Sequence, residues 1–490
     1  MESRRSHPIT VPSPRPDRAT LLAVLPVSPF PSLLDAECVG APPSVPRSTL
    51  TDSRSWATHP GSTGVRAPRP RPSQGDRIDP DMDDSPSLPE AGPGAGLTLF
   101  IDANPLADRH LTGIGRYTAR IVLALSRHVP LRFFSNGKEL ILGGPLDPDP
   151  DQDLAELGRR IWKSRRVPLG PPPPRGAGVF GCLRPIERHF PVELSILHDF
   201  TPLVVPWTHS EKTRGMFRGF FAKSLLSSDR ALAVSHATKA DAGWLTPFPQ
   251  DRIVVCPSGP SLCVSRHGDD RPVERRPNVG LVVSTLEPRK NAFFLLDWFR
   301  ETRVLPPSSE LWWVGPLGWM TSRRSLERYR RLPNGRRVRF LGVVPDTELC
   351  RLYRTAGWSI YPSLYEGFGF PVLDSLRHGT PVLASYNSAL KEFDTPGISF
   401  FDPADPSSVD EAWLAFQARG PVDLATKSLD ERYNWDRVAR TIIDTLSEAL
   451  AEKEAAGSRR HRVDAPPLPG AGPIAGLATV PRGTASSVIP

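Results

Sequence analysis

Residues 362–385 read Pro-Ser-Leu-Tyr-Glu-Gly-Phe-Gly-Phe-Pro-Val-Leu-Asp-Ser-Leu-Arg-His-Gly-Thr-Pro-Val-Leu-Ala-Ser, a pattern that predicts a turn, a helix and a buried strand. Pro371 suits the first turn of a helix, because the N–H that proline lacks has no intrahelical partner there. Gly367 and Gly369 leave the preceding backbone open, so its amides and the helix N-terminus can approach an anion. The apolar run 381–385 is short enough to be the next buried strand. The stretch therefore predicts a turn that offers amides to a phosphate.

Strand and helix patterns alternate in two halves of the chain. Strand candidates occur at 97–102, 194–197, 230–234 and 252–256, and again at 279–284, 311–315, 337–342, 358–361 and 381–385. Amphipathic helices follow two of them, at 113–126 and at 347–356, the second with Asp346 as its predicted N-cap. Residues 139–190 are broken by prolines and give no clear pattern. The alternation predicts two doubly wound α/β sheets, which bind ligands at the carboxyl ends of their strands.

The ends of the chain differ from its centre. Many of the 57 prolines among the 490 residues lie in 1–95, which is also rich in Ser and Arg, and 457–490 is rich in Gly, Pro and Ala. Neither end can bury enough apolar surface to offset its ordering entropy, so both are expected to be disordered. We expect Rossmann-like domains at 96–268 and 276–433, and a closing helix at 434–456.

Composition also argues against several classes of protein. The apolar stretch 19–34 contains three prolines and is too short to span a bilayer. We therefore expect a cytoplasmic protein, with peripheral attachment to the inner face of the cell membrane left open. The net charge is +8, but the arginines form no single cluster and are most frequent in the tails. We therefore expect no nucleic-acid partner. Met82 stands just before the first foldable segment and is an alternative start, which leaves open whether residues 1–81 are translated.

Two acids, Glu366 and Asp374, flank the glycines of the opening stretch. Their spacing resembles the Glu-x7-Glu signature of the group 1 (family 4) retaining glycosyltransferases of the GT-B fold, and the form here is similar to bacterial mannosyltransferases. The second acid, however, is an aspartate, one methylene shorter than the usual glutamate. The alternative interpretation of the stretch is a surface loop with two solvated acids.

Other segments resemble the same family, in the same order, between residues 97 and 450. The glycine loop 112–117 (Thr-Gly-Ile-Gly-Arg-Tyr) opens the first helix, His198-Asp199 ends a strand, and 287–291 (Glu-Pro-Arg-Lys-Asn) follows the first strand of the second half. In a GT-B protein two doubly wound, Rossmann-like domains face each other across a cleft. The resemblance implies that these segments meet there.

The resemblance also implies a role for each residue. Glu366 and His198 would contact the transferred sugar, and Asp374 would hold the ribose hydroxyls of the donor. Arg289 and Lys290 would stabilise the diphosphate leaving group, because fixed cations must do so where no metal does. Further donor contacts would come from the backbone at Gly113, Gly115, Gly367, Phe368, Gly369 and Phe370.

The implied activity is retaining transfer of a hexose from a sugar nucleotide, with GDP-mannose favoured as the donor. The acceptor would be an oligosaccharide or a lipid-linked saccharide in surface polysaccharide assembly. No cofactor or metal is expected, because Asp147, Asp149 and Asp151 lie in a proline-rich loop rather than at a strand end. A non-catalytic binding or scaffold protein remains the alternative, because Asp374 and Ser284 depart from residues that relatives carry.

Overall fold

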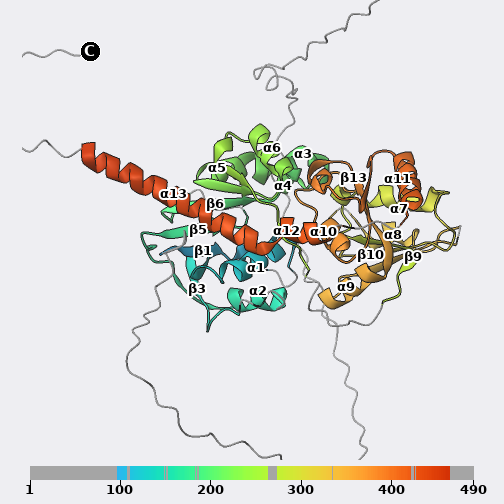
Figure 1. Ribbon diagram of the computed structural model, residues 1–490, viewed down its shortest axis with the longest axis horizontal. Coiled ribbons are helices and arrows are strands. Elements are labelled where there is room, and N and C mark those ends of the chain that lie inside the picture. Colours follow the sequence, from blue (N-terminus) through green and yellow to red (C-terminus); the bar gives the residue numbers. More distant parts are fainter. Residues whose placement is uncertain are drawn as a thin grey trace, which may run out of the picture. The chain divides into compact units, whose positions relative to one another are not determined.

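The computed structural model describes residues 96–463, apart from 108–110, 148, 150–152, 183, 185–186, 263–272, 320, 334, 421–423 and 425. The expectations for residues 1–95 and for 464–490 lie outside this described part. Within it, the chain forms two sheets, each covered by helices, and a long C-terminal helix (Figure 1).

The first sheet has eight strands in the order β4-β3-β2-β1-β5-β6-β7-β8. Its strands are β1 (Thr98–Asp102), β2 (Leu131–Ser135), β3 (Lys138–Ile141), β4 (Arg165–Pro168), β5 (Gly176–Phe180), β6 (Val192–Leu197), β7 (Arg230–Ala233) and β8 (Ile253–Val255). The pairs from β2 through β1 to β8 are parallel, and β5 and β6 are buried along their whole length. At the other edge β3 pairs antiparallel with both β2 and β4, a hairpin edge that the sequence did not predict.

Helices and short helical turns connect these strands. They are η1 (Asn104–Leu106), α1 (Gly113–Leu125), α2 (Leu154–Trp162), α3 (Thr201–Val204), η2 (Pro206–Thr208), α4 (Glu211–Met216), the π-helical η3 (Phe217–Phe221), α5 (Ala222–Leu226), α6 (His236–Leu245) and η4 (Gln250–Arg252). The proline-broken range 139–190, which gave no clear sequence pattern, contains α2, β4 and β5. The strands of this range pair with strands that are not adjacent in the sequence, so the local pattern of apolar residues is a weak predictor of them.

The second sheet has six parallel strands in the order β11-β10-β9-β12-β13-β14. They are β9 (Arg276–Val283), β10 (Glu310–Val314), β11 (Arg337–Gly342), β12 (Ala356–Tyr361), β13 (Val382–Ser385) and β14 (Ile398–Phe401). The helices are η5 (Pro288–Lys290), α7 (Ala292–Glu301), α8 (Arg323–Glu327), α9 (Asp346–Thr355), α10 (Phe370–Arg377), η6 (Ser388–Glu392), α11 (Pro406–Arg419) and α12 (Thr426–Arg432). This is the doubly wound sheet that the alternating pattern predicted.

The prediction that Asp346 caps α9 is wrong. Asp346 is the first residue of the helix, Pro345 holds the N-cap position, and no side chain caps the helix there. The Asp346 carboxylate instead accepts two hydrogen bonds from Arg116 of α1, from Nη1 at 2.9 Å and from Nη2 at 2.6 Å. A bidentate charged pair with the other domain outcompetes a local cap.

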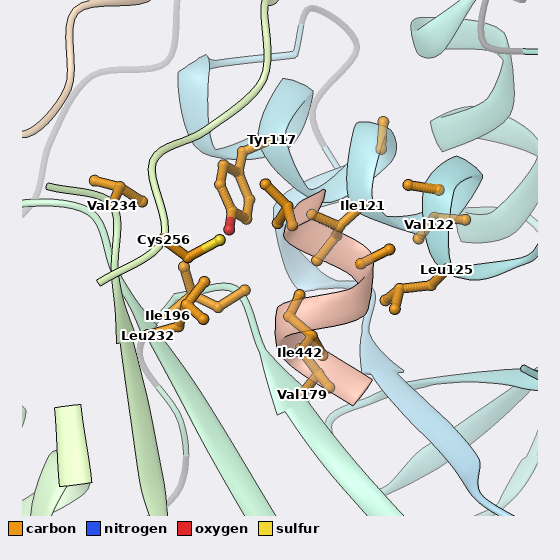
Figure 2. Packing of buried hydrophobic residues seen from close by; sticks show 14 of the residues in the cluster. Tyr117, Ile121, Val122, Leu125, Val179, Ile196, Leu232, Val234, Cys256 and Ile442 are labelled. Carbon is orange, nitrogen blue, oxygen red and sulfur yellow. The ribbon is translucent and has the colours of Figure 1, made fainter. Parts of the chain in front are cut away.

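The last helix, α13 (Trp435–Val463), returns to the first domain and extends beyond the expected end at residue 456. It packs against α1 and next to β6 and β7. In Figure 2 Ile442 of α13 lies among Ile121 and Val179 of that domain, and both isoleucines are fully buried. Burying such a side chain stabilises the fold by roughly 1.5–3 kcal/mol. The helix thus ties the end of the chain to the first sheet.

No helix in the described part of the chain combines the length and the apolar character needed to cross a bilayer.

Candidate active site

Loops from the two sheets meet in direct contact at one point. His198 follows β6 of the first sheet, and Gly367 follows β12 of the second. A Cβ on Gly367 would overlap the His198 carbonyl oxygen, so only glycine allows this approach. Thr238 Oγ1 lies 3.3 Å from the carbonyl oxygens of both residues. Two of the predicted site segments, from opposite halves of the chain, are therefore neighbours.

Arg289, Lys290 and Glu366 form one charged cluster. Arg289 Nη1 donates to Glu366 Oε2 at 2.9 Å, and Lys290 Nζ donates to Glu366 Oε1. The three side chains are only 13–15% exposed. A second carboxylate, that of Glu287, lies 3.0 Å from Arg289 Nη2. The structure thus brings together the two predicted cations and the predicted sugar-binding acid.

The charge of Glu366 is fixed by these neighbours. Burial alone would raise the Glu366 pKa, but the charges of Lys290 and Arg289 outweigh burial and lower it from 4.5 to about 2. Glu366 is therefore ionised at neutral pH and neutralises the cations itself. An incoming anion would compete with this carboxylate for Arg289 and Lys290.

Backbone contacts hold the cluster in place. Leu364 N donates to the carbonyl oxygen of Arg289 at 2.9 Å, and Arg289 Nη1 donates to that of Tyr365 at 3.1 Å. Ser388 Oγ of η6 accepts from Glu366 N at 2.9 Å. These bonds connect the loops after β9 and β12 and hold their charged groups in fixed positions, as a site that stabilises developing charge requires.

His198 lies partly buried beside the glycine loop. Its Nε2 donates to the Gly181 carbonyl oxygen at 2.9 Å, and the Tyr117 ring packs edge-on against the imidazole at 4.9 Å between centroids. Burial lowers the His198 pKa, more than the Gly181 bond and Asp199 raise it, so the ring is neutral at pH 7. Nδ1 is then the nitrogen left to accept a hydrogen bond from a ligand.

The two glycines of the loop before α1 differ. A Cβ on Gly115 would come within 2.7 Å of the Pro105 carbonyl oxygen, so this glycine is needed for packing. Around Gly113 no described heavy atom lies within 4 Å of a Cβ position. Open space at Gly113 leaves its backbone accessible to a ligand.

The turn before α10 presents backbone rather than side chains. Gly369 has φ +113° and precedes the helix, whose first residue is Phe370. The Phe368 ring packs against the rings of Phe370, Phe393 and Tyr433. Beside this turn a cavity of about 10 Å³, lined by Ser284, Lys290, Glu366 and Gly369 among others, leaves room for about one water. A larger ligand needs these loops to separate.

Asp374 lies on α10 and is buried against the segment that follows β8, away from the charged cluster. It is 2% exposed, and it accepts hydrogen bonds from Ser261 N at 3.0 Å, from Leu262 N at 3.2 Å and from Ser261 Oγ. Burial raises its pKa to about 6, against the lowering effect of those donors. The carboxylate thus holds the end of the segment that leaves the first domain. It could reach a ribose only after that segment moves.

Comparisons with known proteins find similar sequences. Residues 277–416 match the protein family described as "Glycosyl transferases group 1". The chain is 29% identical over 335 residues to O-antigen chain mannosyltransferase B of Escherichia coli, covering 61% of this chain and 85% of that protein. Residues 277–416 are a group 1 glycosyltransferase domain.

Two further matches are more distant. The glycosyltransferase is 24% identical over 288 residues to the serotype-specific mannosyltransferase WbdA of Escherichia coli, covering 53% of this chain but only 34% of WbdA, so it spans about a third of that longer protein. Anabaena HepE in complex with UDP and glucose is a structural neighbour with a TM-score of 0.48 and 16% identity, covering 72% of this chain and 99% of HepE. Both sheets of the glycosyltransferase are doubly wound, as expected from its resemblance to GT-B proteins.

Several hydrogen bonds between the domains were not predicted from the sequence. Tyr365 Oη donates to both carboxylate oxygens of Asp241 on α6, at 2.8 and 2.9 Å. The Glu392 carboxylate accepts from the backbone N–H groups of His236 and Ala237, at the start of the same helix. These partners come from different halves of the glycosyltransferase, so no local pattern reveals them.

A metal site is absent from the described part of the glycosyltransferase, where no group of three or more His, Cys, Asp or Glu side chains could hold an ion. Asp147 and Asp149 lie in a loop without regular structure, and Asp151 lies outside the described residues.

Proposed function

We propose that the protein is a retaining hexosyltransferase that moves mannose from GDP-mannose to a saccharide acceptor in surface polysaccharide assembly. The names of its relatives, O-antigen and serotype-specific mannosyltransferases, support mannose and this setting. The observation that carries the proposal is the partly buried cluster of Arg289, Lys290 and Glu366 at the strand ends. Two fixed cations next to an acid match a diphosphate and a sugar hydroxyl.

In the proposed complex the diphosphate takes over Arg289 and Lys290 as partners. Glu366, released from them, accepts hydrogen bonds from hydroxyls of the bound sugar. When the bond between the anomeric carbon and the β-phosphate oxygen breaks, that oxygen gains negative charge, which the two cations stabilise. Because both are held by the surrounding loops, little reorganisation is required at that moment.

The acceptor oxygen then bonds to the anomeric carbon on the face that the phosphate leaves. Its proton passes to the departing phosphate oxygen, so no protein base is required. His198 faces the sugar in this arrangement, and its Nδ1 accepts a hydrogen bond from a hydroxyl. A neutral imidazole suits this role better than a charged one, because the sugar carbon itself becomes positive in the transition state.

The rest of the donor would bind to backbone groups and to one carboxylate. The amides of residues 367–370 and the open backbone at Gly113 would contact the phosphates, together with the N-terminus of α10. Asp374 would hold the ribose once Ser261 and Leu262 release it. A lipid-linked acceptor would bring the protein to the inner face of the cell membrane as a peripheral enzyme.

A donor screen tests this proposal. Thermal unfolding and hydrolysis are measured with GDP-mannose, GDP-fucose, UDP-glucose, UDP-galactose and ADP-glucose, without acceptor. We expect the largest stabilisation and the fastest hydrolysis with GDP-mannose. Selective binding of a uridine donor would overturn the mannose assignment. If no donor binds or is hydrolysed, the non-catalytic alternative replaces the enzyme.

A further inference from the structure

Exposed apolar side chains concentrate in one part of the first domain. The described part of the chain exposes 13 large apolar or aromatic side chains, and six of them lie between residues 207 and 245. The six are Trp207, Met216, Phe220, Leu226, Trp244 and Leu245. The two tryptophans are 66% and 84% exposed, so most of each residue is in contact with solvent. A concentration of large apolar side chains on a surface is typical of an interaction site.

Short helices on one face of the first sheet carry these residues. Figure 1 shows α3, α4, α5 and α6 together on the same side of that domain. Beneath them, Leu225 of α5 and Ala242 of α6 pack with Ala231 and Ala233 of β7 in one buried cluster. Leu232, which points to the opposite face of the strand, belongs instead to the cluster that contains residues of α13. The helices therefore cover the face opposite α13, and the six exposed residues lie on their outer side.

The helical stretch that carries three of the six is also basic. Residues 211–226 (Glu-Lys-Thr-Arg-Gly-Met-Phe-Arg-Gly-Phe-Phe-Ala-Lys-Ser-Leu-Leu) contain four lysines or arginines and one acid, which gives a net charge of +3. The acid, Glu211, is paired with Arg214 and lies 3.8 Å from Arg218. The stretch therefore presents an excess of positive charge to solvent.

Basic and apolar side chains alternate along the outer side of this stretch. Lys212, Met216, Phe220 and Lys223 follow one another at intervals of four, four and three positions, and all of them are exposed. Side chains at such intervals lie on one side of a helix. On the inner side, Phe221 packs against the buried cluster. The stretch thus carries apolar side chains on both sides, whereas a helix that faces water has a polar outer side.

An anionic lipid surface fits this combination better than another protein surface does. At the boundary between headgroups and acyl chains, Trp and Phe rings bury their apolar parts while Lys and Arg contact the headgroup phosphates. A second copy of the chain would bring two faces of the same positive sign together, and like charges repel. The sign of the charge and the exposed tryptophans therefore favour lipid over self-association.

This surface continues from the candidate active site along the chain. The Asp199 carboxylate accepts hydrogen bonds from Thr201 N at 3.1 Å and from Thr201 Oγ1 at 2.8 Å, and Thr201 is the first residue of α3. The segment that leads through α3 into α4 is therefore anchored next to His198. A saccharide whose lipid stays in the bilayer would be presented at this side of the first domain.

We propose that one lipid-binding face, made of the exposed residues of η2, α4, η3, α5 and α6, attaches the protein to an anionic phospholipid bilayer. Its six apolar side chains enter the headgroup region, and Lys212, Arg218 and Lys223 contact the phosphates. The link to a lipid-linked acceptor rests on the proposed function. The lipid contact itself does not involve the donor site, so it is measured without transfer.

Flotation of the full chain with vesicles tests the proposal. Vesicles of phosphatidylcholine alone are compared with vesicles that also contain phosphatidylglycerol. We expect the protein to bind the anionic vesicles, and to bind them more weakly as salt is added. Charge in the arginine-rich ranges 1–95 and 457–490 can attract the same vesicles, so variants are needed to identify the face.

Two double variants separate apolar contact from charge. Phe220→Ser with Trp244→Ser removes two rings, and Lys212→Gln with Lys223→Gln removes two charges. Each double variant should lower the partition coefficient for anionic vesicles by about tenfold or more. Thermal unfolding and GDP-mannose hydrolysis should match those of the wild type, because all four side chains are exposed.

Leu414→Ser with Lys427→Gln is the matched control. Leu414 on α11 is 54% exposed, and Lys427 on α12 is exposed as well, but both lie in the second domain. The control should bind vesicles as the wild type does. Phospholipids with brominated acyl chains give a second readout, because they quench tryptophans that enter the bilayer. Trp207→Phe with Trp244→Phe should lose most of this quenching and still float.

The outcomes distinguish three results. If the wild type does not float with anionic vesicles, or if both double variants float as it does, the lipid-binding face is refuted, while GDP-mannose hydrolysis would leave the proposed function standing. If light scattering shows a dimer that both variants convert to a monomer, the face binds a second copy and the lipid assignment is wrong. If vesicles bind through the face but no sugar nucleotide is bound or hydrolysed, the proposed function falls and the lipid contact stands.

Discussion

Replacing Lys290 by alanine should reduce turnover far more than it reduces stability. Lowering the Glu366 pKa from 4.5 to about 2 corresponds to roughly 3 kcal/mol of net attraction to Lys290 and Arg289 together, since one pKa unit is about 1.4 kcal/mol. Arg289 keeps its bond to Glu366 in the variant, so only part of this attraction is lost from the folded state. We expect a loss of about 1–2 kcal/mol in the free energy of unfolding at pH 7.

The cost in rate should be larger, because the leaving phosphate loses a fixed cation when its charge develops. Removing one such donor lowers kcat by about 10²–10³-fold. The assay measures kcat with GDP-mannose and thermal unfolding of the same samples. Lys290→Arg should retain more activity than the alanine variant, since it keeps the charge. Lys427→Ala, which removes an exposed lysine of α12, is the control and should change neither quantity.

Acid titration of the same variant provides an independent check. A carboxyl group whose folded pKa is lowered contributes stability above its unfolded pKa and loses it as pH falls through the folded value. Glu366 should therefore contribute above about pH 4.5 and lose this contribution between pH 4.5 and about 2. In Lys290→Ala this loss should be smaller. A kcat within threefold of the wild type would refute the assignment of Lys290 to the leaving group.

Three further predictions concern the contact between the domains. Gly367→Ala should lower kcat by about 10²-fold, because the new Cβ forces the loop away from His198. Gly215→Ala on α4 is the control and should not change kcat, since no described atom is near its Cβ position. Equal kcat values for the two variants would contradict this prediction. A double-mutant cycle of Arg116→Ala and Asp346→Ala should give a coupling of about 0.5–1 kcal/mol in unfolding, since both side chains are about 30% exposed; additivity would show that the pair contributes nothing. The Asp374 pKa is raised from 3.8 to about 6, so its contribution to stability is greatest below pH 4 and is lost as pH rises to 6. This decline should be smaller in Asp374→Asn, which thermal unfolding measured between pH 4 and 6 would show.

The sequence predicted the parts of the site that depend on local pattern. Two glycines and a proline in the first turn of α10 indicate the turn before that helix. The pair Arg289-Lys290 directly follows a buried strand. Both segments could therefore be predicted to lie at strand ends. That Lys290 and Glu366 share one ion pair was not foreseen. The pairing depends on the order of β9 and β12 in the sheet, which local residues do not specify.

Contacts between the domains were the hardest to predict. Arg116 and Asp346 are 230 positions apart in the chain, and Asp346 was assigned to a helix cap because that use is visible locally. Asp374 was assigned to ribose from the family pattern alone, yet its carboxylate holds Ser261 and Leu262 in this structure. In both cases the carboxylate binds residues that are distant in the sequence. The sequence had instead suggested the helix N-terminus as the partner of Asp346 and the donor ribose as the partner of Asp374.

The most direct test of the central claim is the anomeric configuration of the product. The protein is incubated with GDP-α-D-mannose and octyl α-D-mannopyranoside in the presence of EDTA, and the new linkage is assigned by NMR from its one-bond C–H coupling. The account predicts an α-linked product, formed at the same rate with and without the chelator. A β-linked product, or transfer that stops in EDTA, would contradict a retaining enzyme in which Arg289 and Lys290 stabilise the leaving diphosphate.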